Sequence, residues 1–160
     1  DVVGHDHHEA PAGDSFEAFP VSVVLANVAA MFGEEARNKG LDLRVVPSGA
    51  VVNTAPLALM RIVSNLVSNA VKYTETGRVL LGCRRRNGHL CIETHDTGPG
   101  MSESEIARLA EPYERASNAP GTGLGLALVH ELAATAKLDL QLISEPGKGT
   151  RAIVCAERVS

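Results

Sequence analysis

A hairpin signal in the middle of the chain, lying between two helical patterns, limits the possible folds more than any other feature. Residues 79–85 and 90–95 alternate like strands, and Asn87-Gly88 between them is a dipeptide that favours a tight two-residue turn. Apolar side chains recur at helical spacing before the hairpin, over 56–73, and after it, over 124–136. Helical segments on both sides of a hairpin predict one domain in which helices pack on an antiparallel sheet.

The remaining patterns extend this prediction. A helical pattern runs from Val23 to a glycine at position 40, and 41–46 alternates like a strand. Two more strand-like runs, 138–144 and 150–157, close the chain around a Pro-Gly-Lys-Gly turn. We therefore expect a two-layer α/β sandwich of the α+β class, in which helices cover one face of a mixed, mostly antiparallel sheet.

The composition fits one soluble domain. Apolar residues make up 44% and charged residues 21% of the 160 residues, and the net charge of −4 provides no basic face suited to nucleic acid. No apolar run reaches the roughly 18 residues that span a bilayer, and no signal peptide is visible. We expect a cytoplasmic domain over 15–160 after a disordered linker over 1–14, without contact to nucleic acid or membrane.

Three cysteines, Cys83, Cys91 and Cys155, all fall in strand-like runs. Their spacing matches no zinc-binding pattern, and their odd number argues against a disulfide framework. The sequence therefore predicts buried free thiols in a reducing compartment.

Two asparagines, Asn65 and Asn69, lie four residues apart in the helical segment 56–73, so they share one helix face. Their amide oxygens are hard, neutral ligands that Mg²⁺ accepts alongside water and phosphate. Lys72, at the next turn, can reach a phosphate as a point charge. An isolated asparagine pair is more typical of a polar helix surface, but the glycine loops that follow favour a metal and phosphate site.

Two glycine-punctuated loops follow. Asp96 ends an apolar strand, and Gly98 and Gly100 after it let the backbone bend close to a flat ring. The Asp96 carboxylate could then accept a hydrogen bond from a purine amino group, with Met101 as an apolar wall against the base. The alternative interpretation of this segment is a plain turn without a ligand. Residues 121–126, Gly-Thr-Gly-Leu-Gly-Leu, set three glycines before a helix, where backbone N–H groups suit phosphate. The loop is neither a P-loop nor a dinucleotide fingerprint.

In this order, the segments resemble the catalytic and ATP-binding domain of bacterial sensor histidine kinases, within the GHKL group of ATP-binding folds. The resemblance runs from Phe16 to Val154 and implies a Bergerat-type ATP-binding fold. Its motifs are the N box, the G1 box, a form of the F box, the G2 box and the last glycine box, at 65–74, 96–100, 111–115, 121–126 and 147–150 respectively.

The resemblance implies a Mg-ATP site. Asn69 would coordinate Mg²⁺ with help from Asn65, while Asp96 would read the adenine amino group with support from Thr150 through water. Residues 99–120 would form the ATP lid. The implied catalytic residues are Asn65 and Lys72, and the implied nucleotide-binding residues are Asn65, Asn69, Lys72, Tyr73, Asp96, Gly98, Gly100, Met101, Arg115, Gly121, Thr122, Gly123, Leu124, Gly125, Leu126 and Thr150.

The resemblance also implies an ATP-dependent protein histidine kinase of two-component signal transduction. In hydrolytic relatives such as gyrase, mismatch-repair and heat-shock ATPases, the position of Asn65 is typically Glu, which activates water, whereas a neutral amide cannot act as a general base. We expect the γ-phosphoryl group to pass to a histidine on dimerisation and phosphoacceptor helices of the same kinase. From there it would pass to the receiver domain of a response regulator.

The sequence departs from the family pattern at two points. Ala110 and Tyr113 stand where the F box usually carries Phe, and His8-Glu9 lacks the pattern of an H box. We therefore expect a catalytic fragment, the cytoplasmic part of a sensor, that is inactive in autophosphorylation alone. Two alternatives stay open: a catalytically weak nucleotide-binding regulatory module, and a serine kinase of the anti-sigma type, although the run 69–74 fits sensor kinases better.

Overall fold

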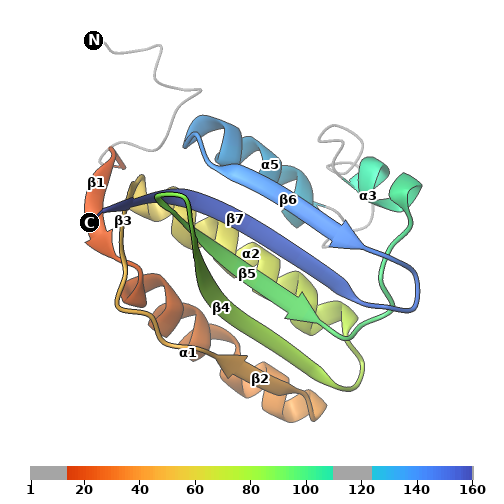
Figure 1. Ribbon diagram of the computed structural model, residues 1–160. Helices are drawn as coiled ribbons and strands as arrows, with labels where there is room; N and C mark the ends of the chain where they lie inside the picture. Colours follow the sequence, from red (N-terminus) through yellow and green to blue (C-terminus); the bar gives the residue numbers. More distant parts are fainter. Residues whose placement is uncertain (1–13, 110–123, 160) are drawn as a thin grey trace.

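The computed structural model of the protein describes residues 14–109 and 124–159. Within them, seven strands form one layer and the helices form a second layer behind it (Figure 1). The helices are α1 (Ser22–Lys39), α2 (Pro56–Tyr73), α3 (Glu103–Leu109) and α5 (Leu124–Thr135). The strands are β1 (Glu17–Pro20), β2 (Asp42–Val45), β3 (Val51–Thr54), β4 (Arg78–Arg86), β5 (His89–Asp96), β6 (Asp139–Ser144) and β7 (Thr150–Val159).

The strand order is β1-β3-β7-β5-β4-β2, with β6 paired to β7. Only β2 and β4 run parallel, and the other pairs are antiparallel. β6 and β3 follow one another along the same edge of β7, because β6 pairs with 150–155 and β3 with 157–159. This arrangement confirms the predicted mixed, mostly antiparallel sheet covered on one face by helices. The short strands β1 and β3 were not predicted.

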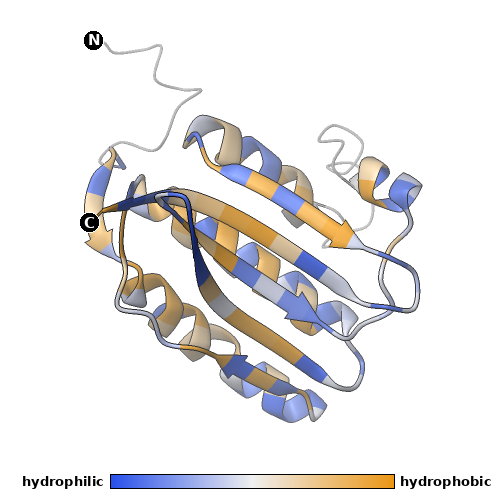
Figure 2. Ribbon diagram, viewed as in Figure 1, coloured by the Kyte–Doolittle hydropathy of each residue, from blue (hydrophilic) through white to orange (hydrophobic). Residues whose placement is uncertain are grey.

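The hydrophobic core lies between the sheet and α1, α2 and α5. From Asp139 to Leu142 of β6, polar and apolar residues alternate (Figure 2), and Leu140 and Leu142 pack against the core. Along β5, Leu90 and Ile92 belong to the same core. This period of two places alternate side chains on the helix-covered face. In the described part of the chain, no helix combines the length and the apolar character that crossing a bilayer requires.

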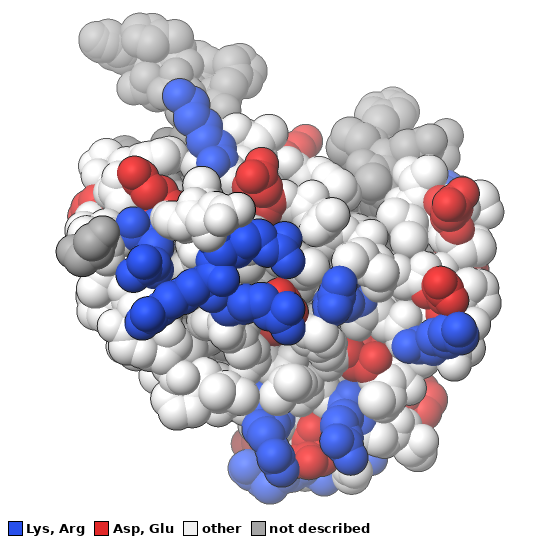
Figure 3. Space-filling view, in the orientation of Figure 1, with Lys and Arg blue, Asp and Glu red and all other residues white. Residues whose placement is uncertain are grey.

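The opposite face of the sheet carries many charged side chains (Figure 3). Glu93 of β5 lies on this face and is only 5% exposed. Its carboxylate lies 2.8 Å from His95 Nε2 and 3.6 Å from Arg84 Nε. Arg84 and the two arginines after it are exposed at the hairpin end.

The end of α1 and the β4–β5 turn form at the residues that the sequence predicted. α1 ends at Gly40, whose φ of 77° is left-handed and whose N–H caps the last carbonyls of the helix. In the β4–β5 turn, Asn87 and Gly88 have φ values of 51° and 81°. Two positive φ values in a two-residue hairpin loop define the turn that this dipeptide favours.

Asp14 caps the amino end of α2 from outside the helix. Its Oδ1 accepts a hydrogen bond from Leu57 N at 2.7 Å, and its Oδ2 accepts one from Ala58 N at 3.0 Å. The residue is 3% exposed. Asp14, which was predicted to belong to the linker, therefore contacts the domain; the rest of the predicted linker, 1–13, lies outside the described residues.

We expect Asp14→Ala to lower the free energy of unfolding by about 1–2 kcal/mol. The substitution removes the acceptor for two N–H groups and a negative charge from the positive end of the helix. Urea denaturation followed by circular dichroism measures the change. The control is Glu17→Ala at an exposed position of β1, and equal midpoints for the two variants would contradict the capping role.

The prediction of three free thiols is wrong for two of them. Cys91 on β5 lies directly opposite Cys155 on β7, with a Cα–Cα distance of 4.0 Å, and a disulfide joins them. Directly opposed residues of an antiparallel pair bring their side chains close together, and an odd cysteine count does not exclude one bridge. Cys83 is free, and burial raises the pKa of its thiol to about 11.

Candidate functional site

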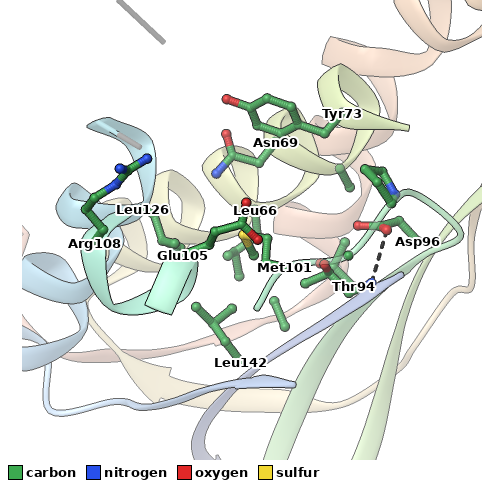
Figure 4. A pocket seen from close by; sticks show the side chains of 15 residues that line it. Leu66, Asn69, Tyr73, Thr94, Asp96, Met101, Glu105, Arg108, Leu126 and Leu142 are labelled. Carbon is green, nitrogen blue, oxygen red and sulfur yellow. Dashed lines mark hydrogen bonds between the residues drawn. The ribbon is translucent and has the colours of Figure 1, made fainter. Parts of the chain in front are cut away.

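A cavity of about 330 Å³ lies between α2, α3 and α5 and the adjoining ends of β5, β6 and β7 (Figure 4). Part of its lining consists of residues that the sequence singled out, namely Asn69, Tyr73, Asp96, Gly100, Met101, Leu126 and Thr150. Pro99, Glu105 and Arg108 of the lining belong to the segment predicted as the ATP lid, and the remaining lining residues were not singled out: Leu66, Ala70, Thr94, Leu142 and Ala152. The fold thus gathers residues of four separate sequence motifs, 65–74, 96–100, 121–126 and 147–150, around one cavity.

Other predicted residues lie beside the cavity or outside the described chain. Asn65 is one turn before Asn69 on α2, and Lys72 holds its ammonium 5.8 Å from the centre of the Tyr73 ring; neither Asn65 nor Lys72 lines the hollow. Two predicted residues, Leu124 and Gly125, open α5. The residues that fall outside the described ranges are Arg115, Gly121, Thr122 and Gly123.

The Asp96 carboxylate is held in a fixed orientation. Its Oδ1 accepts hydrogen bonds from Gly98 N at 2.9 Å and from Thr150 N at 3.1 Å, the second drawn dashed in Figure 4. Burial raises the pKa of Asp96, while the two N–H donors and neighbouring His95 act against that rise. Within residues 14–109 and 124–159 no donor bonds to Oδ2, so that oxygen is available to a ligand.

The glycines after Asp96 serve a close approach of two loops. Gly147 N donates to Pro99 O at 2.6 Å, which joins the loop after β5 to the β6–β7 turn. Gly100 has φ +75°, and a Cβ there would overlap the Glu145 carbonyl oxygen. Gly149 has φ +84°, and a Cβ there would overlap the Asp96 carbonyl oxygen. Gly100 was predicted to let the backbone approach a flat ring, whereas in the structure it approaches the β6–β7 turn at the Glu145 carbonyl.

Ser144 forms hydrogen bonds with residues on both sides of this junction. Its Oγ accepts a hydrogen bond from Met101 N at 2.8 Å and lies 2.7 Å from Thr150 Oγ1. Ser144 was not predicted as a site residue, because its role depends on the pairing that sets it opposite Thr150 in the β6–β7 ladder.

Glu105, another residue that lines the cavity, caps the amino end of α3. Glu105 Oε1 accepts a hydrogen bond from Ser102 N at 2.8 Å, and Ser102 Oγ accepts one from Glu105 N at 3.2 Å. This reciprocal pair is a capping box, whose Ser-x-x-Glu pattern was readable in the sequence. The bonds from Ser102 lower the pKa of Glu105. The Glu105 carboxylate is therefore engaged in holding the helix end.

The donors offered to a divalent cation are neutral amides. Asn69 lines the cavity beside Tyr73 (Figure 4), and Asn65 lies one turn earlier. In the described ranges, no three His, Cys, Asp or Glu side chains gather as a metal cage. This donor set fits a hard cation such as Mg²⁺ that keeps waters and is held mainly by phosphate oxygens.

Residues 54–159 match the family model described as "Histidine kinase-, DNA gyrase B-, and HSP90-like ATPase". The sensor histidine kinase RcsC of Escherichia coli strain K12 is 38% identical over 105 residues, which cover 62% of this chain and 11% of RcsC. The virulence sensor protein BvgS of Bordetella bronchiseptica is 32% identical over 154 residues, which cover 88% of this chain and 12% of BvgS. The chain therefore spans only a small part of these relatives.

Solved structures of similar fold include those of ShkA and of a histidine kinase catalytic domain. Full-length ShkA in complex with AMPPNP superposes with a TM-score of 0.78 at 29% identity, covering 91% of this chain and 32% of that one. The nucleotide-free catalytic domain of histidine kinase ThkA superposes with a TM-score of 0.76 at 19% identity, covering 89% of this chain and 95% of that one. At the lower identity, the likeness concerns the fold alone.

Proposed function

Because the chain belongs to the family of histidine kinase-, DNA gyrase B- and HSP90-like ATPases, we propose that its cavity binds Mg-ATP and presents the γ-phosphoryl group to a histidine on separate dimerisation and phosphoacceptor helices. The observation that carries this proposal is the Asp96 carboxylate in the cavity wall, with one oxygen fixed by two backbone donors and the other available. The named sensor kinases among the relatives support the same reading.

In this proposal, the adenine amino group donates to Asp96 Oδ2. Adenine carries a donor at this position and guanine carries an acceptor, so an ionised carboxylate favours adenine. Apolar side chains of Met101 and Leu142 line the cavity and would pack against the base. Thr150, whose N–H orients Asp96, would support the contact from β7.

The phosphates would extend towards α2 and the start of α5. Asn69 and Asn65 would hold Mg²⁺ together with phosphate oxygens, and the metal would neutralise charge on the phosphates. Lys72 would add a positive charge near the same group. Leu124 and Gly125 open α5, and the amino end of a helix favours an anion.

The described carboxylates of the cavity favour transfer to a protein over hydrolysis. Asp96 and Glu105 are the acidic residues among the described lining. Asp96 is engaged at the base, and the lowered pKa of Glu105 makes it a poor general base. Asn65 is a neutral amide and cannot take a proton from water. Positioning of the γ-phosphoryl group for an imidazole acceptor is then the main contribution of the domain, and a response regulator receiver would take the group from that imidazole.

We expect Mg-ATP binding with little label on the chain alone when it is incubated with γ-labelled ATP. Added dimerisation and phosphoacceptor helices of the same kinase should become labelled, and the label should be lost in acid and kept in base, as for a phosphoramidate. Gel autoradiography after each treatment measures this.

Three results separate the alternatives. Strong label on the chain alone would contradict transfer to a separate acceptor. Acid-stable label on a serine would favour a serine kinase. ATP binding without label on any acceptor helix would favour a regulatory module.

A further inference from the structure

Thr94 places a buried hydroxyl on the cavity wall. The residue is 3% exposed and lines the cavity. Within the described residues, its Oγ1 has no hydrogen-bond partner. Thr94 and Asp96 are two residues apart on β5, so both side chains point to the same face of the sheet, as Figure 4 shows. A buried hydroxyl and a buried carboxylate thus lie in succession along one wall.

A hydroxyl in this environment disfavours folding unless something bonds to it. Removing a polar group from water without a replacement partner is unfavourable. Valine has nearly the same shape as threonine and lacks the polar atom, so a wall built for packing alone would be better served by valine. Because Thr94 lines the cavity, a ligand bound there would supply the missing hydrogen-bond partner of its hydroxyl.

Two other threonines give a comparison. Thr54 and Thr74 are also buried, and their hydroxyls also lack a partner among the described residues. Neither of them lines the cavity. A missing partner alone is therefore not the argument; what distinguishes Thr94 is its place in the wall next to Asp96.

We propose that Thr94 is a further base-reading residue, whose hydroxyl donates, directly or through one water, to a ring nitrogen of the bound adenine. This inference rests on the proposed function. When the adenine amino group donates to Asp96, the ring nitrogens on either side of that group are hydrogen-bond acceptors. A threonine hydroxyl can donate to such an atom, so Thr94 would read the base beside the edge that Asp96 reads.

The test compares nucleotide affinity and thermal stability in the same variants. Thr94→Val should weaken ATP binding about 5-fold, which corresponds to one ordinary hydrogen bond, while raising the melting temperature. Thr54→Val is the matched control: it should also raise the melting temperature and leave affinity unchanged. Thr94→Ser keeps the hydroxyl and should retain most of the affinity, which a purely structural role would not predict.

Analogues of ATP identify the contacted atom. Either 7-deaza-ATP or 1-deaza-ATP should bind the wild-type chain more weakly than ATP, and that difference should disappear in Thr94→Val. Equal ATP affinity for wild type and Thr94→Val, measured by calorimetry, would overturn the role of Thr94 and leave the proposed function intact. Failure of the wild-type chain to bind ATP at all would overturn the proposed function and this inference together.

Discussion

We expect Asp96→Asn to weaken ATP binding by about 10- to 100-fold, the loss that corresponds to one hydrogen bond to a charged group. The amide oxygen must stay at the position of Oδ1 to accept from Gly98 N and Thr150 N. The amide nitrogen then occupies the position of Oδ2 and meets the adenine amino group donor to donor. The substitution therefore replaces an attraction by a repulsion without changing the size of the side chain, and isothermal calorimetry with Mg-ATP measures the effect.

A control on the same strand separates binding from folding. Glu93→Gln makes the same chemical change three residues earlier, on the face of the sheet away from the helices, where Glu93 pairs with Arg84 and His95. We expect this variant to lose stability and to keep its ATP affinity. Wild type should also prefer ATP to GTP, and Asp96→Asn should narrow that preference. An unchanged affinity in Asp96→Asn would remove the basis for adenine recognition.

Reduction of the Cys91–Cys155 bond should lower the free energy of unfolding by about 4 kcal/mol, because the bridge spans 64 residues and restricts the unfolded chain. For a domain of this size, that change corresponds to a fall of roughly 12 °C in the melting temperature. Calorimetry of the oxidised protein with and without dithiothreitol measures it. Thiol titration of the unfolded protein should give one thiol before reduction and three after it.

The remaining thiol supplies the control. Cys83→Ser leaves the bridge in place, so its melting temperature should fall on reduction as much as that of wild type. Replacement of Cys91 and Cys155 together by alanine should remove the response to reductant. Three thiols in the unreduced protein, or a melting temperature that dithiothreitol does not change, would contradict the bridge.

Local signals predicted much of the fold. The bounds of α2 follow from Pro56 at its start and from an apolar stripe that ends at Tyr73. Gly40 and the Asn87-Gly88 turn required positive φ values that few other residues accept. β1 and β3 escaped prediction, because neither four-residue segment shows a regular alternation of apolar and polar side chains. Their formation depends on pairing with each other and with the distant β7 rather than on a pattern of their own.

The site was predictable only where one residue type has a distinctive chemistry. A carboxylate followed by two glycines, and two asparagines on one helix face, can be read from the sequence, and Asn69 and Asp96 do line one cavity. Thr94 and Ser144 are ordinary strand residues until the register of β5, β6 and β7 sets them there. The cysteine bridge escaped for the same reason, since the β5–β7 register alone brings its two ends together.

The two hydrogen bonds from α2 to Asp14 link the start of the described chain to the helix that borders the cavity. Asp14 accepts hydrogen bonds from the first turn of an 18-residue helix, which is about 27 Å long. The other half of that helix carries Asn69 and Tyr73, which line the cavity. A force applied to the chain before Asp14 would thus act on one end of a helix whose other end borders the cavity.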